Sequence, residues 1–69
     1  MTNTELLRHK IDSSGYKIRF IAEKIGLTYQ GFLKKINGES EFKASEIQGL
    51  STFLSLSNTE REQIFFGRM

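Results

Sequence analysis

The sequence predicts an all-α protein, a compact five-helix bundle that forms one domain over residues 1–69. Three observations predict this fold class. The chain contains no proline, few β-branched residues follow one another, and apolar residues recur at i, i+3 and i+4 spacing. A chain this short buries only about 60% of the surface of its unfolded form, so the expected core is small and built from Leu, Ile and Phe.

The first helix is expected to begin at a capping box in Thr2–Glu5 and to end at Gly15. In such a box the hydroxyl and the carboxylate accept hydrogen bonds from amides at the helix start. Leu7 and Ile11, four residues apart, share one face of this helix. That face is expected to be buried.

The second and third helices are separated by a short glycine-containing turn. The second runs from about Ile18 to Ile25 and ends at Gly26, which adopts a positive φ without steric cost. Thr28 is the expected N-cap of the third helix, which stops at Asn37 and Gly38. The apolar stripes of these two helices contain Ile18, Ile21, Ala22, Ile25, Phe32, Leu33 and Ile36.

The last third of the chain predicts a loop and two more helices. Residues 39–43 form the loop, and Phe42 within it is expected to fill part of the core. The fourth helix spans about Ser45 to Leu54. The fifth begins at a second capping box, Ser57–Glu60, and ends at Ile64–Gly67.

Composition excludes several classes of protein. With no cysteine, neither a disulfide nor a thiolate metal site stabilises the fold. No apolar run approaches the roughly 20 residues of a membrane helix, and the first residues do not resemble a signal peptide, so a cytoplasmic location is expected. Eight of the ten Lys and Arg residues lie in residues 1–43, against five of the eight acids. This modest excess fits a polyanionic partner and equally fits ordinary solvated charge.

Catalysis is not expected. The single histidine, His9, has no cysteine beside it, and the serines stand at helix caps and turns. No glycine-rich loop that binds phosphate is present. We therefore expect no catalytic residue, no metal, no cofactor and no small-molecule substrate.

Residues 18–37 carry a recognisable pattern: a short helix, a glycine turn and a second helix, with Ile21, Ala22, Ile25, Gly26, Leu27 and Phe32 in register. This pattern resembles the helix-turn-helix of phage Cro and repressor proteins, and implies a lambda-repressor-like fold. Residues 37–42, 45–47 and 64–66 extend the resemblance to short Cro-like modulators of repression, or antirepressors, of temperate phages of Gram-positive bacteria. A plain helical bundle with the same periodicity remains the alternative.

The resemblance implies that the third helix meets the partner. In a DNA complex Tyr29, Gln30 and Lys34 would face base edges. The phosphate contacts implied by the same resemblance are Thr28, Arg19, Lys35, Asn37 and Lys43.

Several positions depart from the DNA-binding pattern. Family members commonly open the second helix with a capping residue and a glutamine, where this chain has Lys17 and Ile18. Phe20 replaces a usually polar surface residue, and Lys35 replaces a usually apolar one. At 100° per residue Leu33 falls about 40° from Tyr29, on the flank of the expected recognition face. Leu33 either widens the core stripe or belongs to an apolar patch with Tyr29 and Phe20.

The resemblance implies two functions, and the departures favour the first of them. The first is an antirepressor of a phage lysis–lysogeny switch, which pairs with the phage repressor and blocks its DNA-binding domain. The second is a Cro-like repressor that binds operator DNA directly, and a more distant choice is an antitoxin or plasmid copy-control regulator. In either of the first two, the expected partner-binding residues are Thr28, Tyr29, Gln30, Leu33, Lys34 and Asn37, flanked by Lys17, Ile18, Arg19, Phe20 and Lys43. Self-association is expected to use Phe65 and Phe66, although Phe is more often a core residue.

Overall fold

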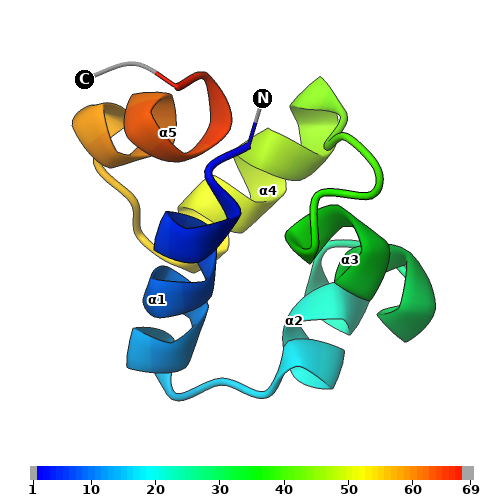
Figure 1. The fold of residues 1–69 in the computed structure, drawn as a ribbon. Coiled ribbons are helices and arrows are strands. Elements are labelled where there is room, and N and C mark those ends of the chain that lie inside the picture. The colour runs from blue at the N-terminus through cyan, green and yellow to red at the C-terminus, as the bar shows by residue number, and fades with distance from the viewer. Residues whose placement is uncertain (1, 68–69) are drawn as a thin grey trace.

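A computed structural model describes residues 2–67, and within them the chain forms five helices and no strand (Figure 1). The predicted all-α fold class with five helices is therefore confirmed. The helices are α1 (Thr4–Ser14), α2 (Ile18–Lys24), α3 (Tyr29–Ile36), α4 (Ala44–Phe53) and α5 (Asn58–Phe65). In Figure 1, α2 and α3 lie together on the right, α5 and α1 lie on the left with α5 above α1, and α4 lies between the two groups.

One hydrophobic core joins the helices. Every helix contributes at least one buried apolar side chain, and the periodicity of the sequence predicted most of them. Each apolar residue that leaves water contributes roughly 1.5–3 kcal/mol, and this burial holds the short helices together. The buried apolar residues are Leu7, Ile11, Ile21, Ala22, Phe32, Ile36, Phe42, Leu50, Ile64 and Phe65.

The start of α1 differs from the predicted capping box. The N-cap is Asn3, whose Oδ1 accepts a hydrogen bond from the Leu6 amide at 3.0 Å. The backbone N–H of Asn3 in turn donates to the carbonyl of Ile64 at 2.6 Å. This contact with the end of α5 fixes Asn3 at the first position outside the helix, so the predicted box at Thr2–Glu5 is wrong.

The connection between α2 and α3 is short and depends on Gly26. Its φ is 80°, a left-handed conformation that glycine adopts without the penalty of a side chain. The Leu27 amide donates to the carbonyl of Ala22 at 2.9 Å and closes the end of α2. The chain therefore reverses quickly enough for α3 to pack against α2.

The loop between α3 and α4 contributes a core residue, as the sequence predicted. Phe42 is buried and meets Phe32 and Phe65 edge-on, with ring centroids 6.3 and 5.4 Å apart. Phe65 is only 4% exposed, so the prediction that it takes part in self-association is wrong. Phe66 is 48% exposed, and its role in self-association stays a prediction.

The described residues contain no helix with the length and apolar character that crossing a membrane requires.

Candidate functional site

The first turn of α3 is held by Thr28. Its Oγ1 accepts a hydrogen bond from the Gly31 amide at 3.0 Å, which confirms the predicted N-cap. A Cβ on Gly31 would lie 2.9 Å from that same oxygen, so glycine leaves space for the cap. The hydroxyl of Thr28 is thus engaged in a capping hydrogen bond, which positions the residues that follow it.

The outer face of α3 carries the predicted contact residues. Gln30 and Lys34 are exposed, whereas Tyr29 and Leu33 are half-buried. Leu33 lies outside the core and outside the partly buried side chains that pack against the core. The half-buried Leu33 and Tyr29 therefore adjoin two exposed polar side chains. At the far end of α3, the Asn37 side-chain oxygen accepts a hydrogen bond from the Arg8 guanidinium of α1.

Three flanking residues on and before α2 lie beside the start of α3. Lys17 is the exposed N-cap of α2 and makes no side-chain capping bond. The guanidinium carbon of Arg19 lies 4.2 Å from the centre of the Tyr29 ring. Phe20 is 40% exposed, as the sequence predicted. A groove of about 460 Å³ runs between these elements, lined by Lys17, Arg19, Phe20, Glu23, Leu27 and Tyr29.

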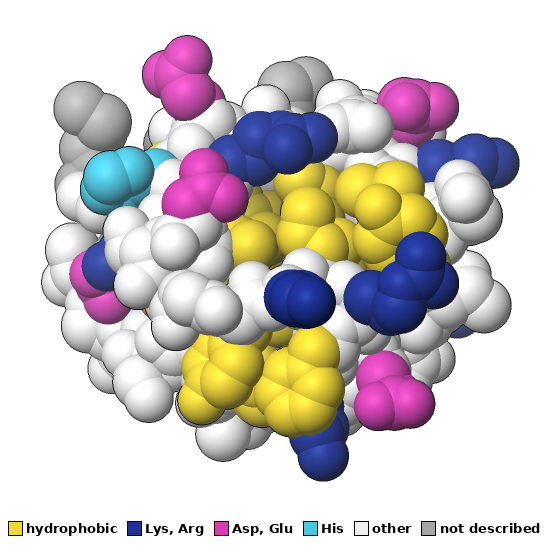
Figure 2. All heavy atoms as spheres, turned by 90° about the horizontal axis from the view of Figure 1, so that it is seen from below, with side chains coloured by type: hydrophobic (Ala, Val, Ile, Leu, Met, Phe, Trp, Pro, Cys, Tyr) yellow, Lys and Arg dark blue, Asp and Glu magenta, His cyan; other side chains and the backbone are white. Residues whose placement is uncertain are grey.

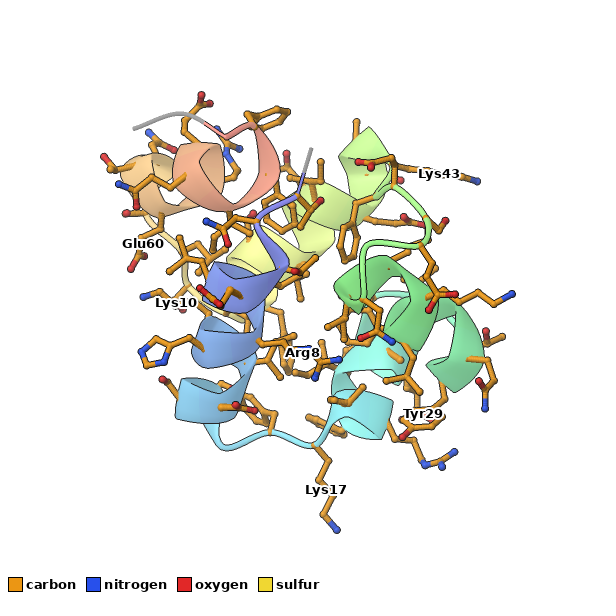
Figure 3. The ribbon with its side chains drawn as sticks, viewed as in Figure 1. Arg8, Lys10, Lys17, Tyr29, Lys43 and Glu60 are labelled. Atoms are coloured by element: carbon orange, nitrogen blue, oxygen red, sulfur yellow. The ribbon has the colours of Figure 1, made fainter. Side chains whose placement is uncertain are left out.

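Two predicted flanking residues lie elsewhere. Ile18 is half-buried and packs against the core as part of the inner stripe of α2, outside the residues that line the groove, and its role as a contact residue stays a prediction. Lys43 is the exposed N-cap of α4. Figure 3 places it at the opposite end of the molecule from Lys17 and Tyr29, so it does not join their surface.

Sequence reasoning missed an aromatic cluster, formed by Tyr16, Phe20 and Phe53. The Tyr16 ring lies 4.8 Å from Phe53 and 5.6 Å from Phe20, centre to centre, and Tyr16 is 48% exposed. Lys24 adds an ammonium 5.2 Å from the Phe20 ring centre. Tyr16 lies between α1 and α2, where helical periodicity does not distinguish buried from exposed positions. The only indication of the cluster in the sequence was an aromatic residue directly before Lys17.

Hydrophobic and basic side chains gather on one face of the molecule. Figure 2 shows hydrophobic side chains in the middle of this face with Lys and Arg side chains among and around them. Lys17 extends from this lower end of the molecule in Figure 3, close to the connection between α1 and α2.

A buried ion pair lies on the inner side of α3. Lys35 Nζ donates to Glu46 Oε1 at 2.6 Å, and the two side chains are 12% and 10% exposed. Lys35 was predicted to contact phosphate, and this prediction is wrong because its ammonium is engaged inside the protein. The backbone amide of Lys43 also donates to Glu46 Oε1, at 2.9 Å, and caps α4.

The environment of Glu46 changes its acidity. Burial by itself raises the pKa of this carboxyl, but the hydrogen bonds from Lys35 and from the Lys43 amide, together with both positive charges, outweigh it. The net result is a pKa below the usual value of 4.5. At neutral pH the pair is therefore charged, and it joins α3 to the first turn of α4.

The groups gathered at the α2–α3 face are aromatic rings, ammonium and guanidinium groups, one amide and the carboxylate of Glu23, which are able to stack, pair charges and form hydrogen bonds. No family model, curated protein or solved structure matches the chain. Within residues 2–67, no group of three or more His, Cys, Asp or Glu side chains is arranged to hold a metal ion.

Proposed function

We propose that the protein is a transcription regulator of a phage genetic switch, acting as an antirepressor that binds the DNA-binding domain of the phage repressor. In this proposal α2, the Gly26 turn and α3 form a helix-turn-helix whose outer face meets a protein. The proposal rests on the pattern in residues 18–37 and on the surface around it.

The observation that carries the choice of partner is the exposed Phe20. It lies beside Tyr16 and at the rim of the groove that reaches Tyr29. Large exposed apolar patches mark sites of contact with proteins, and aromatic residues are enriched at the centres of such interfaces. A phosphate backbone offers no equivalent contact for a phenyl ring.

The contact between Arg19 and Tyr29 also favours a protein partner. Its guanidinium lies over the Tyr29 ring, an arrangement that orders both side chains on the surface. Ordered aromatic and arginine side chains are the residue types that contribute most to protein interfaces, because little entropy is lost when a partner binds them.

Direct binding of operator DNA is the second candidate. It is favoured by the exposed Gln30 and Lys34 on the outer face of α3, since glutamine pairs bidentately with adenine and lysine donates to guanine. Lys17, also exposed, would then contact phosphate.

One titration separates the two candidates. The purified protein is titrated into fluorescent promoter DNA, at several salt concentrations, with and without the repressor that controls the promoter. We expect no sequence-selective binding by the protein alone, and release of the repressor from DNA when the protein is added. Selective binding by the protein alone, at about nanomolar concentration and steeply weakened by salt, would contradict the antirepressor proposal and support the second candidate.

A further inference from the structure

The aromatic cluster and the adjoining groove form one continuous surface, because Phe20 belongs to both. The cluster joins the segment before α2, α2 itself and the end of α4. Its rings contact one another, yet Tyr16 and Phe20 remain 48% and 40% exposed. An apolar side chain of a partner that covered both rings would remove their exposed surface from water.

The charged side chains that line the groove or lie over the aromatic cluster are mostly positive. Lys17 and Arg19 line the groove, and Lys24 lies over the Phe20 ring. Glu23 is the one acid among the groove's lining residues. A partner that covers the surface therefore gains the most binding free energy if it brings carboxylates to the rim. A basic partner is repelled.

The position of Arg19 leaves it able to bind a carboxylate. A guanidinium that stacks on a ring uses its flat face, and its N–H groups point outward in the plane of the group. Those N–H groups fit the two oxygens of a carboxylate in a bidentate pair. With its central carbon 4.2 Å from the Tyr29 ring centre, the Arg19 guanidinium is held where an acidic side chain of a partner could reach its N–H groups.

We propose that the aromatic cluster and the groove beside it bind an acidic protein segment, which inserts an apolar side chain next to Phe20 and places carboxylates against Lys17, Arg19 and Lys24. The apolar side chain supplies most of the affinity, and the carboxylates supply the orientation. This inference rests on the proposed function only for the identity of the natural partner, because we place the acidic segment on the repressor.

Nucleic acid fits this surface less well. A base that stacks on a side chain needs an open ring face. Tyr16 stacks on Phe20, the Lys24 ammonium approaches the same ring, and Arg19 covers one face of Tyr29. These contacts leave less of the ring faces open to a stacking base.

The first test uses synthetic helical peptides as probes. One carries two apolar residues four positions apart and flanking glutamates, and its twin carries lysine in place of each glutamate. Titrated into the ¹⁵N-labelled protein, the acidic peptide is expected to shift the amide signals of residues 16–24 and 53, and to bind about tenfold more weakly in high salt. Equal binding of the basic twin, no binding of the acidic peptide, or its displacement from these residues by duplex DNA would overturn the proposal.

Matched variants locate the site. Phe20→Ala is expected to weaken the acidic peptide at least about tenfold, while Phe66→Ala, which truncates a comparably exposed ring on another groove, leaves its affinity unchanged. Lys17→Glu is expected to weaken binding, and Lys43→Glu, at the other exposed lysine N-cap, is not. Equal effects within either pair would contradict the proposed site.

The same variants separate this inference from the proposed function. If the repressor forms a complex that Phe20→Ala and Lys17→Glu leave intact, the inference about this surface is wrong and the antirepressor function stands. If the protein binds the acidic peptide as expected but forms no complex with the repressor, the proposed function is wrong and the binding surface stands.

Discussion

The two faces of α3 differ in what they contribute to the protein. On the inner face Phe32 and Ile36 are fully buried and Lys35 forms its ion pair with Glu46. On the outer face Gln30 and Lys34 contact solvent. The inner face of this short helix therefore contributes to stability, the outer face is the one we propose for recognition, and substitutions at adjacent positions separate the two.

The largest effect is expected from Phe32→Ala. Phe32 is 0% exposed and its ring packs against Phe42, so its removal leaves a cavity at the centre of the molecule. The free energy of unfolding is expected to fall by about 3–5 kcal/mol. Chemical denaturation followed by circular dichroism measures the change, and a loss below about 1 kcal/mol would show that Phe32 is not central to the core.

The buried ion pair is expected to have the next largest effect. In Glu46→Gln the ammonium of Lys35 stays buried and loses its carboxylate, so the free energy of unfolding should fall by about 1–3 kcal/mol at neutral pH. The pKa of Glu46 is lowered on folding, so this stability is fully present above pH 4.5 and is lost as the pH falls through the folded-state pKa.

Denaturation at a series of pH values tests the sign of this effect. The difference in unfolding free energy between the natural protein and Glu46→Gln should shrink progressively below pH 4.5. Other carboxyl groups are present in both proteins and cancel in the difference. A difference that stays constant down to about pH 3 would show that the ionised carboxylate of Glu46 contributes nothing.

A smaller effect is expected at the N-cap of α3. Thr28→Ala removes the acceptor for the Gly31 amide and should lower the free energy of unfolding by about 1 kcal/mol. Thr28→Ser keeps the hydroxyl and serves as the control. If the two variants are equally stable, the hydrogen bond of Thr28 is not what holds the first turn of α3.

The smallest effects on stability are expected on the outer face. Gln30→Ala and Lys34→Ala should each change the free energy of unfolding by no more than about 0.5 kcal/mol, because both side chains are exposed. Lys35→Ala, one residue along, is the matched control and should be clearly destabilising. Equal stability of Lys34→Ala and Lys35→Ala would show that the two faces of α3 do not differ in their contribution to the free energy of unfolding.

Features set by neighbouring residues were predictable from the sequence. The left-handed turn at Gly26 after α2, the cap at Thr28 and the capping box at Ser57–Glu60 all appear where local chemistry places them. The exposure of Phe20 followed from its position outside the apolar stripe of α2.

Features that depend on distant parts of the chain were not predictable. Lys35 and Glu46 meet only because α3 and α4 pack together, and nothing in the sequence pairs the two residues. The contact between Asn3 and Ile64 moves the start of α1 away from the expected box. The aromatic cluster depends on Phe53, which lies far along the chain from Tyr16.

The central claim is that the outer face of α3 binds a protein partner, and Leu33→Asp tests it most directly. Leu33 is half-buried and lies outside the core, beside the exposed Lys34. Thermal unfolding and binding to the repressor's DNA-binding domain are measured on the same sample. We expect the variant to remain folded, with its melting temperature lowered by less than about 8 °C, and to bind at least about a hundredfold more weakly. Unchanged binding by the folded variant would contradict the claim, and loss of the fold would place Leu33 in the core instead.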